Sequence, residues 1–257
     1  MRKIRLLTQA EMVENTAQAL IQAKHVFDSH GIVFWLDAGT LLGAVREAKI
    51  LGWDTDADLG MWLHDFPKVR EIMPLLKHAG FNTVLNWNRA TLSLHSPNNS
   101  FYHFHFDMHR QNGQYAWKLL FSKRIWTLKS KVTLWKRLVN LSNLRAYAQP
   151  STREKNKKIV SSIFPVKLRN AISKKAWHKL FVLGCFTPHV FPVHHFDKLE
   201  TIRFYGETFH IPSDTNAYLT LRYGDWKTPV QTWDYYKDAG ERRLDLLPEI
   251  TRFLGAD

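Results

Sequence analysis

Cysteine is almost missing from this chain of 257 residues, which contains only Cys185. A single cysteine excludes a disulfide bond within the chain and fits a reducing compartment, so we expect a cytoplasmic protein. Cys185 lies in the apolar stretch at residues 181–186, where a buried, unreactive thiol is expected rather than a nucleophile. The composition therefore argues against thiol chemistry.

Long hydrophobic runs are missing too. No uncharged apolar stretch approaches the roughly 20 residues that a membrane-spanning helix needs. The N-terminus contains basic residues but no apolar core of the kind found in a secretory signal. We therefore expect a soluble or peripheral protein.

Acidic residues are scarce in one segment, residues 116–180. This segment contains 17 Lys or Arg and a single acid, Glu154, which gives it a net charge of +16, whereas the rest of the chain has a net charge of −3. The total charge of +13 therefore arises entirely from this segment. Charge of one sign predicts an anionic partner: nucleic acid, an anionic membrane surface or an acidic glycan.

Residues 117–145, within this basic segment, have apolar side chains at intervals of three or four, which predicts an amphipathic helix. Trp126 and Trp135 among lysines and arginines are typical of a helix that lies in a membrane interface. Packing against the rest of the protein explains the apolar positions equally well, but an ordinary solvated face carries charges of both signs. A second basic helix is expected over residues 167–183.

The other segments alternate between helical and strand patterns. Thr8 and Glu11 form a capping box before a helix that Gly31 ends. Further helices are expected over about residues 40–49 and 65–80, and strands over about residues 32–36, 53–62, 81–87, 91–96 and 101–109. This order predicts one α+β domain with a mixed sheet and packed helices. Its parts are a catalytic core (1–115), a basic helical insertion (116–196) and a C-terminal block (197–257).

Three aspartates, Asp54, Asp56 and Asp58, alternate along the strand expected at residues 53–62, which places their carboxylates on one face. Like charges along one edge repel, so we expect a compensating hard divalent cation such as Mg²⁺. A solvated strand edge would explain one carboxylate, but three in register favour a metal site.

A Gly-Thr pair precedes these acids at the start of an expected helix. Gly39 allows a phosphate to approach the backbone, and Thr40 adds a hydroxyl at a helix N-terminus, where anions are favoured. A phosphate pocket beside a metal-binding strand is what phosphoryl or nucleotidyl transfer needs.

Asp107 lies on the strand expected at residues 101–109 and shares one face with His103, His105 and His109. We expect it to meet Asp56 and Asp58 across the sheet. Histidines at alternate positions are compatible with zinc, but neither cysteine nor a known ligand spacing accompanies them. Their expected role is to line the active site or to lie on an ordinary surface.

Two blocks of the sequence resemble the LicD/fukutin-related family. The first is GTLLGAVR at residues 39–46 with WDTDADLG at residues 53–60, and Asp107 matches the third acid of that family. The second is FYGETFHIP at residues 204–212 with YGDW at residues 223–226. The similarity covers residues 31–109 and 197–230. The chain departs from the family at Thr55, where a second consecutive Asp is common, and at residues 108–109, where an apolar residue and Pro are common.

The resemblance implies a nucleotidyltransferase-type fold and a Mg²⁺-dependent phosphotransferase, with Mn²⁺ as an alternative ion. Such an enzyme moves a phosphorylated alcohol from a CDP-linked donor to a hydroxyl of a glycan and releases CMP. Phosphocholine is the first choice, and ribitol or glycerol phosphate is the alternative. With the basic segment, this predicts a peripheral enzyme at the inner face of the cell membrane that acts on a cell-surface or lipid-linked glycan.

The roles that the resemblance implies fall into two sets. The metal ligands are Asp54, Asp56, Asp58 and Asp107. Of these, Asp56, Asp58 and Asp107 are also the catalytic residues. Asp107 is alternatively the general base. The substrate-binding residues are Gly39, Thr40, Arg46 and Asp225.

Two other classes of function remain open from the sequence. A nucleotidyltransferase acting on a small molecule or RNA would use the basic segment to bind nucleic acid, but the C-terminal block favours the glycan-modifying family, so no nucleic acid partner is expected. An inactive membrane- or glycan-binding protein would have no use for the intact acids.

Overall fold

The computed structural model describes residues 8–54, 56–86, 90–95, 103–121, 186–230, 232–234 and 237–246. The chain divides into two compact units. The first contains Met1–Asn86, Ala90–Lys118 and Val190–Glu241, and the second contains Trp87–Arg89, Leu119–His189 and Arg242–Asp257. The candidate site described below lies in the first unit. The units divide at residues 118/119 and 189/190, whereas the sequence predicted internal boundaries at residues 115/116 and 196/197. That the chain forms a single elaborated domain remains a prediction.

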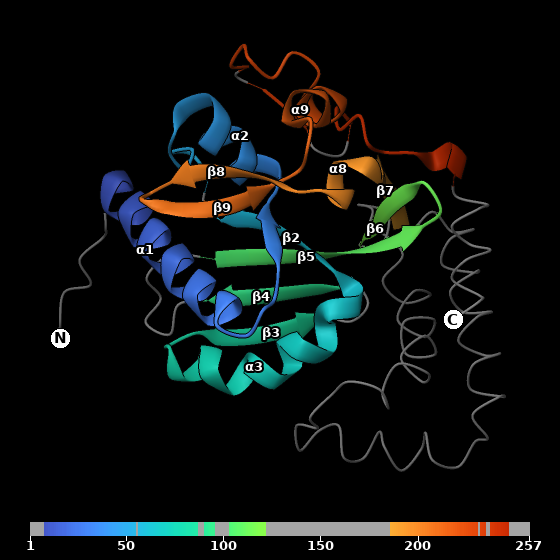
Figure 1. Ribbon diagram of the computed structural model, residues 1–257. Helices are drawn as coiled ribbons and strands as arrows, with labels where there is room; N and C mark the ends of the chain where they lie inside the picture. Colours follow the sequence, from blue (N-terminus) through green and yellow to red (C-terminus); the bar gives the residue numbers. More distant parts are fainter. Residues whose placement is uncertain are drawn as a thin grey trace, which may run out of the picture. The chain divides into compact units, whose positions relative to one another are not determined.

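The described strands form one mixed sheet. They are β1 (Phe34–Leu36), β2 (Ala57–Trp62), β3 (Asn82–Asn86), β4 (Thr91–His95), β5 (His103–Asn112), β6 (Tyr115–Phe121), β7 (Phe186–Pro192), β8 (Glu200–Phe204) and β9 (Glu207–Ile211). Their order is β3-β4-β5-β2-β1-β9-β8, and β6 pairs with β5 and β7 (Figure 1). β2 is parallel to β5 and β1 is parallel to β9, whereas β1–β2, β3–β4, β4–β5 and β8–β9 are antiparallel.

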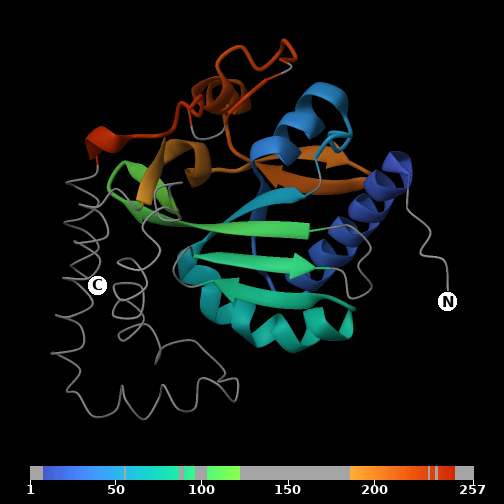
Figure 2. The same ribbon diagram turned by 180° about the vertical axis from the view of Figure 1, so that it is seen from behind.

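Helices pack against this sheet. They are α1 (Gln9–Asp28), α2 (Ala38–Glu47), α3 (Phe66–His78), α8 (His194–Asp197) and α9 (Thr215–Tyr223), with 3-10 turns at Leu63–Asp65 and Leu244–Leu246. α1 begins at the predicted capping box, in which the Thr8 side chain accepts from the backbone N–H of Glu11 and the Glu11 side chain accepts from that of Thr8. α1 and α3 lie together on one face of the sheet (Figures 1 and 2).

The strand β5 shows how the two faces differ. Phe104, Phe106 and Met108 are buried, and Phe106 stacks on Phe27 of α1 with 4.8 Å between ring centroids. His103, His105 and Asp107 alternate with them and are only half-buried, as the sequence predicted for the opposite face. On that opposite face Trp35 of β1 contacts Phe196 of α8, with ring centroids 4.8 Å apart. The polar face of β5 is therefore the face away from α1 and α3.

Most of the predicted elements of the first 112 residues are confirmed, but the acidic strand begins later than expected. β2 starts at Ala57, so Asp54 and Asp56 lie in the loop before it. The Asp54 N–H donates to the Leu51 carbonyl (2.9 Å), which closes a turn in that loop. Alternation along a strand therefore explains the position of Asp58 only, because Asp54 and Asp56 lie in the preceding loop.

The helix expected from residue 117 is wrong at its start, because residues 117–121 belong to β6. Ala116, Trp117 and Leu119 are all buried, so this strand is covered on both faces and lacks the alternation that distinguishes a strand from a helix. The region predicted as helical also contains β7. Residues 122–145, and the second expected helix at residues 167–183, lie outside the described residues.

Candidate active site

The structure brings three of the predicted acids to one face of the sheet. The parallel pairing of β2 with β5 sets Asp58 beside His105, and Gly60 beside Asp107. Asp56 lies just before β2, and its Oδ2 is 3.7 Å from the His105 Nε2. Asp56, Asp58 and Asp107 therefore share a face, as the sequence predicted.

The N-terminus of α2 meets this acidic face. Gly39 has no room for a Cβ atom, because the Asp54 carboxylate lies against it and an Asp58 oxygen is 3.9 Å from the position that the Cβ would take. The Asp58 N–H donates to Thr40 Oγ1 at 2.8 Å, which ties the helix to β2. The Thr40 side chain is buried and holds this junction together, while its contact with a phosphate remains a prediction.

Negative charge accumulates at Asp58. Its burial, followed by the charges of Asp56 and Asp107, raises its pKa to about 7. Among the described residues, no three His, Cys, Asp or Glu side chains are already placed to hold a metal ion. Mg²⁺ is commonly bound by only one or two carboxylates, and substrate phosphates and waters supply its other ligands. Asp56 and Asp58 fit that mode, because a cation beside them would relieve the repulsion that raises the pKa of Asp58.

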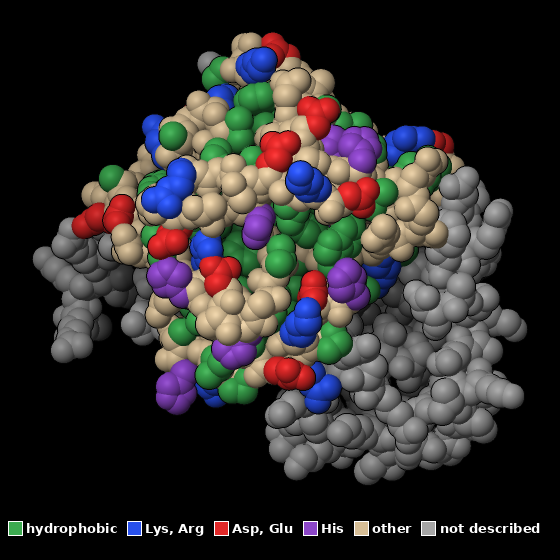
Figure 3. Space-filling view, in the orientation of Figure 1, with side chains coloured by type: hydrophobic (Ala, Val, Ile, Leu, Met, Phe, Trp, Pro, Cys, Tyr) green, Lys and Arg blue, Asp and Glu red, His purple; other side chains and the backbone are tan. Residues whose placement is uncertain are grey.

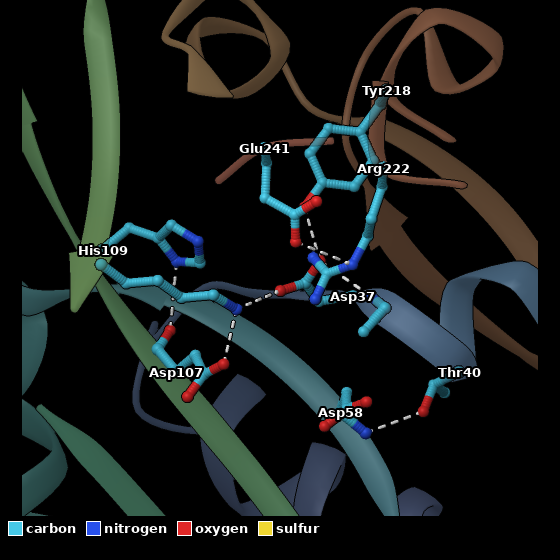
Figure 4. A network of polar contacts seen from close by, with 10 residues as sticks. Asp37, Thr40, Asp58, Asp107, His109, Tyr218, Arg222 and Glu241 are labelled. Carbon is cyan, nitrogen blue, oxygen red and sulfur yellow. Dashed lines mark hydrogen bonds and ion pairs between the residues drawn. The ribbon is translucent and has the colours of Figure 1, made fainter. Parts of the chain in front are cut away.

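A buried ion network centred on Asp37 stands beside these acids (Figure 4). Asp37 follows β1 and is fully buried, and its Oδ1 accepts hydrogen bonds from the Ala38 N–H (2.8 Å) and the Tyr218 hydroxyl (2.5 Å). Arg222 Nη1 donates to the same oxygen at 3.2 Å, and Lys118 Nζ donates to Oδ2 at 3.1 Å. Burial opposes ionisation, but the two cations hold the pKa of Asp37 far below its ordinary value.

Lys118 connects this network to Asp107. Its Nζ donates to Asp107 Oδ2 at 2.5 Å, and the lysine is itself buried. Burial opposes ionisation of Asp107, but the charge and the hydrogen bond of Lys118 outweigh it and lower the pKa of this carboxyl. Asp107 is therefore a fixed anion with one oxygen bound to lysine. A general base works best with a pKa near the operating pH, so Asp107 is poorly suited to that role.

The C-terminal block reaches the site through α9. Tyr218 and Arg222 are one helical turn apart, so both side chains point to Asp37. Arg222 Nε also lies 3.5 Å from Glu241 Oε1. Burial opposes the charge of Arg222, but Glu241 and Asp37 raise its pKa well above the ordinary value. The arginine is thus a permanent cation between two buried acids.

His109 is the neutral member of the network. It is fully buried, and its Nδ1 lies 3.2 Å from the Asp107 carbonyl oxygen, which can only accept, so this nitrogen carries the proton. Burial, followed by the Lys118 charge, lowers the pKa of His109 to about 4. The ring is therefore uncharged at pH 7.

The other two predicted substrate residues lie at the ends of α2 and α9. Arg46 donates to the Trp226 carbonyl (3.2 Å) and to Glu47 Oε1 (2.9 Å), which attaches the end of α2 to the segment after α9. Asp225 is exposed, and none of the described contacts joins it to the acids.

Sequence reasoning did not single out Asp37, Lys118, Arg222 or Glu241. Asp37 had a signal, since it is an acid between a buried strand and the Gly-Thr turn. Lys118 also had a signal, because it is the single charged residue of β6. In the sequence, however, it is one of many basic residues in the segment at residues 116–180 and does not stand out. Arg222 and Glu241 had none, because the residues that pair with them are known only from the fold.

The arrangement suits the binding of phosphates together with a cation. The acids stand at a helix N-terminus, and the buried ions fix Asp107 and the start of α2. Such an arrangement can act on a bound phosphate through positioning and charge neutralisation.

Comparisons with known proteins bear on the same part of the chain. Residues 31–142 match the family model for the LicD/FKTN/FKRP nucleotidyltransferase domain. The chain is 48% identical over 40 residues to "Ribitol 5-phosphate transferase FKRP" of Homo sapiens, and equally to that of Mus musculus, which covers 16% of this chain and 8% of FKRP. It is 32% identical over 69 residues to an uncharacterised protein of Rickettsia typhi, which covers 27% of this chain and 22% of that protein. The matched segments thus span less than a quarter of either relative.

Among solved structures, the lincomycin-bound lincosamide antibiotic adenylyltransferase LnuA aligns with 91% of this chain and 98% of its own, at 11% identity and a TM-score of 0.41. The family match covers β1, α2, β2 and β5, and it includes Asp37, Asp58 and Asp107. Residues 31–142 are thus similar to the LicD/FKTN/FKRP nucleotidyltransferase domain, as the first block of motifs predicted, and the second block, at residues 197–230, lies outside this match.

Proposed function

We propose that this protein is a Mg²⁺-dependent transferase that moves a phosphorylated alcohol from a CDP-linked donor to a hydroxyl of a glycan. The observation that carries the proposal is the set of acids Asp56, Asp58 and Asp107 beside the N-terminus of α2, where burial and the two neighbouring acids raise the pKa of Asp58. The family of residues 31–142 supports the same class of enzyme.

The donor's phosphates are proposed to bind at the N-terminus of α2 beside Gly39, where backbone N–H groups and the helix dipole favour anions. Asp56 and Asp58 would hold Mg²⁺ or Mn²⁺, and Asp54 would support them electrostatically or through water. The bound ion would neutralise charge on the donor's phosphates. Arg46 and Asp225 remain candidates for contacts with the rest of the donor.

In the transfer step, the acceptor hydroxyl oxygen attacks the phosphorus atom that bears the alcohol. A P–O bond to the acceptor forms while the P–O bond to CMP breaks, and CMP leaves with the electron pair. The hydroxyl proton passes to water, since Lys118 lowers the pKa of Asp107 and makes it a weak base. Lys118, whose Nζ also donates to Asp37, instead holds Asp107 as an anion beside Asp58.

Two transferred groups are the leading candidates. Phosphocholine is the first choice because of the family resemblance, and the name of FKRP, a ribitol 5-phosphate transferase, supports ribitol phosphate. The test is to incubate the protein with a panel of CDP-alcohols, Mg²⁺ and glycan acceptors, and to measure CMP release and the mass of the product. An acceptor that gains the nucleotide rather than the phosphorylated alcohol would establish nucleotidyl transfer instead.

Charge-removing variants test the assignment of the acids. Asp56→Asn and Asp58→Asn should each lower CMP release by at least about a hundredfold, because the charge that balances the cation is lost. Asp28→Asn is the matched control, since Asp28 pairs with Lys24 on α1, on the opposite side of the sheet. Normal CMP release by both site variants at saturating Mg²⁺ would refute the assignment.

Association with an anionic membrane is also a proposal, and it rests on the basic segment. No helix among the described residues is long and apolar enough to cross a bilayer. On the face shown in Figure 3, basic and acidic side chains are interspersed, in keeping with the net charge of −3 outside residues 116–180. Most of the basic segment, residues 122–180, lies outside the described residues.

A further inference from the structure

Three histidines form a row on the polar face of β4 and β5. His95 pairs with His103 across these strands, with 4.0 Å between ring centroids, and His103 and His105 are also 4.0 Å apart. His105 Nδ1 lies 3.2 Å from Ser93 Oγ, and its Nε2 lies 3.7 Å from Asp56 Oδ2. This imidazole row (His95, His103 and His105) is half-buried and ends at the acids. α1 and α3 lie on the other face of the same strands (Figure 2).

The imidazole row is a stack of rings. Its rings lie one over another with tilts of 33° and 46° instead of converging on one point. Within the residues that the structure describes, no three His, Cys, Asp or Glu side chains are placed together here to hold a metal ion. Burial, followed by the neighbouring histidines, lowers the pKa of His95 and lowers that of His103 to about 4. Both rings are therefore uncharged at pH 7.

Neutral imidazoles suit a ligand rich in hydroxyl groups. The neutral rings of His95 and His103 each offer one N–H donor and one nitrogen acceptor, and a hydroxyl group can satisfy either. His103 Nε2 is buried without a hydrogen-bond partner in the described part of the chain, whereas native proteins normally give such an atom a partner. An acidic ligand would meet no positive charge at His95 or His103, and at the end of the row it would lie near the carboxylate of Asp56.

The geometry of transfer places the acceptor on the same side. With the donor's phosphates at Gly39, the leaving group departs towards α2, which follows β1. Attacking and leaving oxygens lie roughly in line across the phosphorus. β5 flanks β2 on the side opposite β1 and carries His103 and His105. With the donor bound in this proposed way, the acceptor hydroxyl would enter from the side of the imidazole row.

We propose that the imidazole row is the acceptor subsite, and that it selects an uncharged, hydroxyl-rich acceptor such as a neutral sugar or polyol over an acidic one. The direction of transfer in this inference rests on the proposed function. Ligand binding to the imidazole row does not rest on the proposed function, because it can be measured without a donor.

The binding test is an NMR titration of the full chain labelled at its histidine rings, with ring signals assigned by single substitutions. The neutral probes are methyl glucoside, methyl galactoside and glycerol, and the acidic probes are methyl glucuronide and methyl galacturonide. The signals of the imidazole row should shift with at least one neutral probe and less with its acidic counterpart, while exposed His78 on α3 stays unchanged. Equal or larger shifts with the acidic probes, or no shift with any neutral probe, would overturn the inference.

The transfer test measures how the donor partitions between the glycoside and water. His103→Ala and, independently, His95→Ala should lower transfer relative to hydrolysis about tenfold, through lost hydrogen bonds. His103→Asn should recover part of the ratio because it keeps polar groups, His103→Phe should not, and the control His78→Ala should match wild type. An unchanged ratio in both Ala variants, or full recovery in the Phe variant, would refute the acceptor subsite. If the wild type released no CMP with any donor, the proposed function would be refuted instead. The NMR titration would still test whether the imidazole row binds neutral ligands.

Discussion

At the scale of single residues, the site depends on Asp37, an acid buried between two cations. A buried carboxylate is tolerated only when charge and hydrogen bonds compensate it, and Lys118, Arg222 and Tyr218 all do so. Ala38, the next residue, has a φ of +44°, which is unusual for a residue with a Cβ. The network therefore holds the start of α2 in a conformation that local preference alone would not select.

Asp37→Asn should be strongly destabilising, because it leaves Lys118 and Arg222 buried with less negative charge to balance them. The expected loss in the free energy of unfolding is about 3–5 kcal/mol, measured by urea denaturation. Asp28→Asn, which breaks an exposed pair on α1, should cost less than about 1 kcal/mol. Equal losses in the two variants would show that the Asp37 network does not stabilise the fold.

Asp58 should make stability depend on pH when no divalent cation is present. Its folded pKa of about 7 exceeds the ordinary value of 3.8, so the folded protein binds the extra proton between these limits. Stability relative to Asp58→Asn should therefore fall as the pH rises from about 4 to 7, and Mg²⁺ should reverse the fall. Denaturation of both proteins in a chelator across this range measures the difference, and a flat difference would contradict the electrostatic account.

At the scale of elements, the sequence was most informative where apolar and polar residues alternate. Phe104, Phe106 and Met108 predicted β5 and the face on which Asp107 lies, and the structure agrees. The same reasoning failed for β6, where Trp117 and Leu119 are both buried. The ion network could not be predicted, because Asp37 and Arg222 are 185 positions apart and only the packing of α9 brings them together.

The junction of α2 with the acidic loop should not tolerate a side chain at residue 39. A Cβ on Gly39 would collide with the Asp54 carboxylate, so Gly39→Ala should displace this acid and lower turnover at least tenfold, with a stability cost of about 1–3 kcal/mol. Gly52→Ala is the matched control, because its new Cβ would meet only the flexible Gln9 side chain at 3.1 Å. CMP release and urea denaturation measure both effects. Wild-type turnover in Gly39→Ala would show that Asp54 has no part in the site.

At the scale of the whole molecule, charge is divided unevenly along the chain. Residues 116–180 have a net charge of +16, and Lys118, at their start, serves the buried network. The other basic residues of this segment follow Lys118 in the sequence. A surface that only needs to be soluble mixes both signs, so this segment predicts a specific anionic partner.

Vesicle binding tests whether that partner is a membrane. Each basic residue near an anionic leaflet contributes on the order of 1 kcal/mol, so the protein should sediment with vesicles that contain acidic lipid and dissociate as salt rises. Substituting Glu for Lys129, Lys131, Lys136 and Arg137 together should abolish this binding. The matched control reverses four exposed lysines outside the segment, Lys77, Lys198, Lys227 and Lys237, which changes the net charge equally but should preserve most of the binding. Equal losses in the two sets would reduce the attraction to net charge alone. Binding to neutral and acidic vesicles alike, or to neither, would exclude electrostatic docking and leave a soluble polyanion as the partner of the segment.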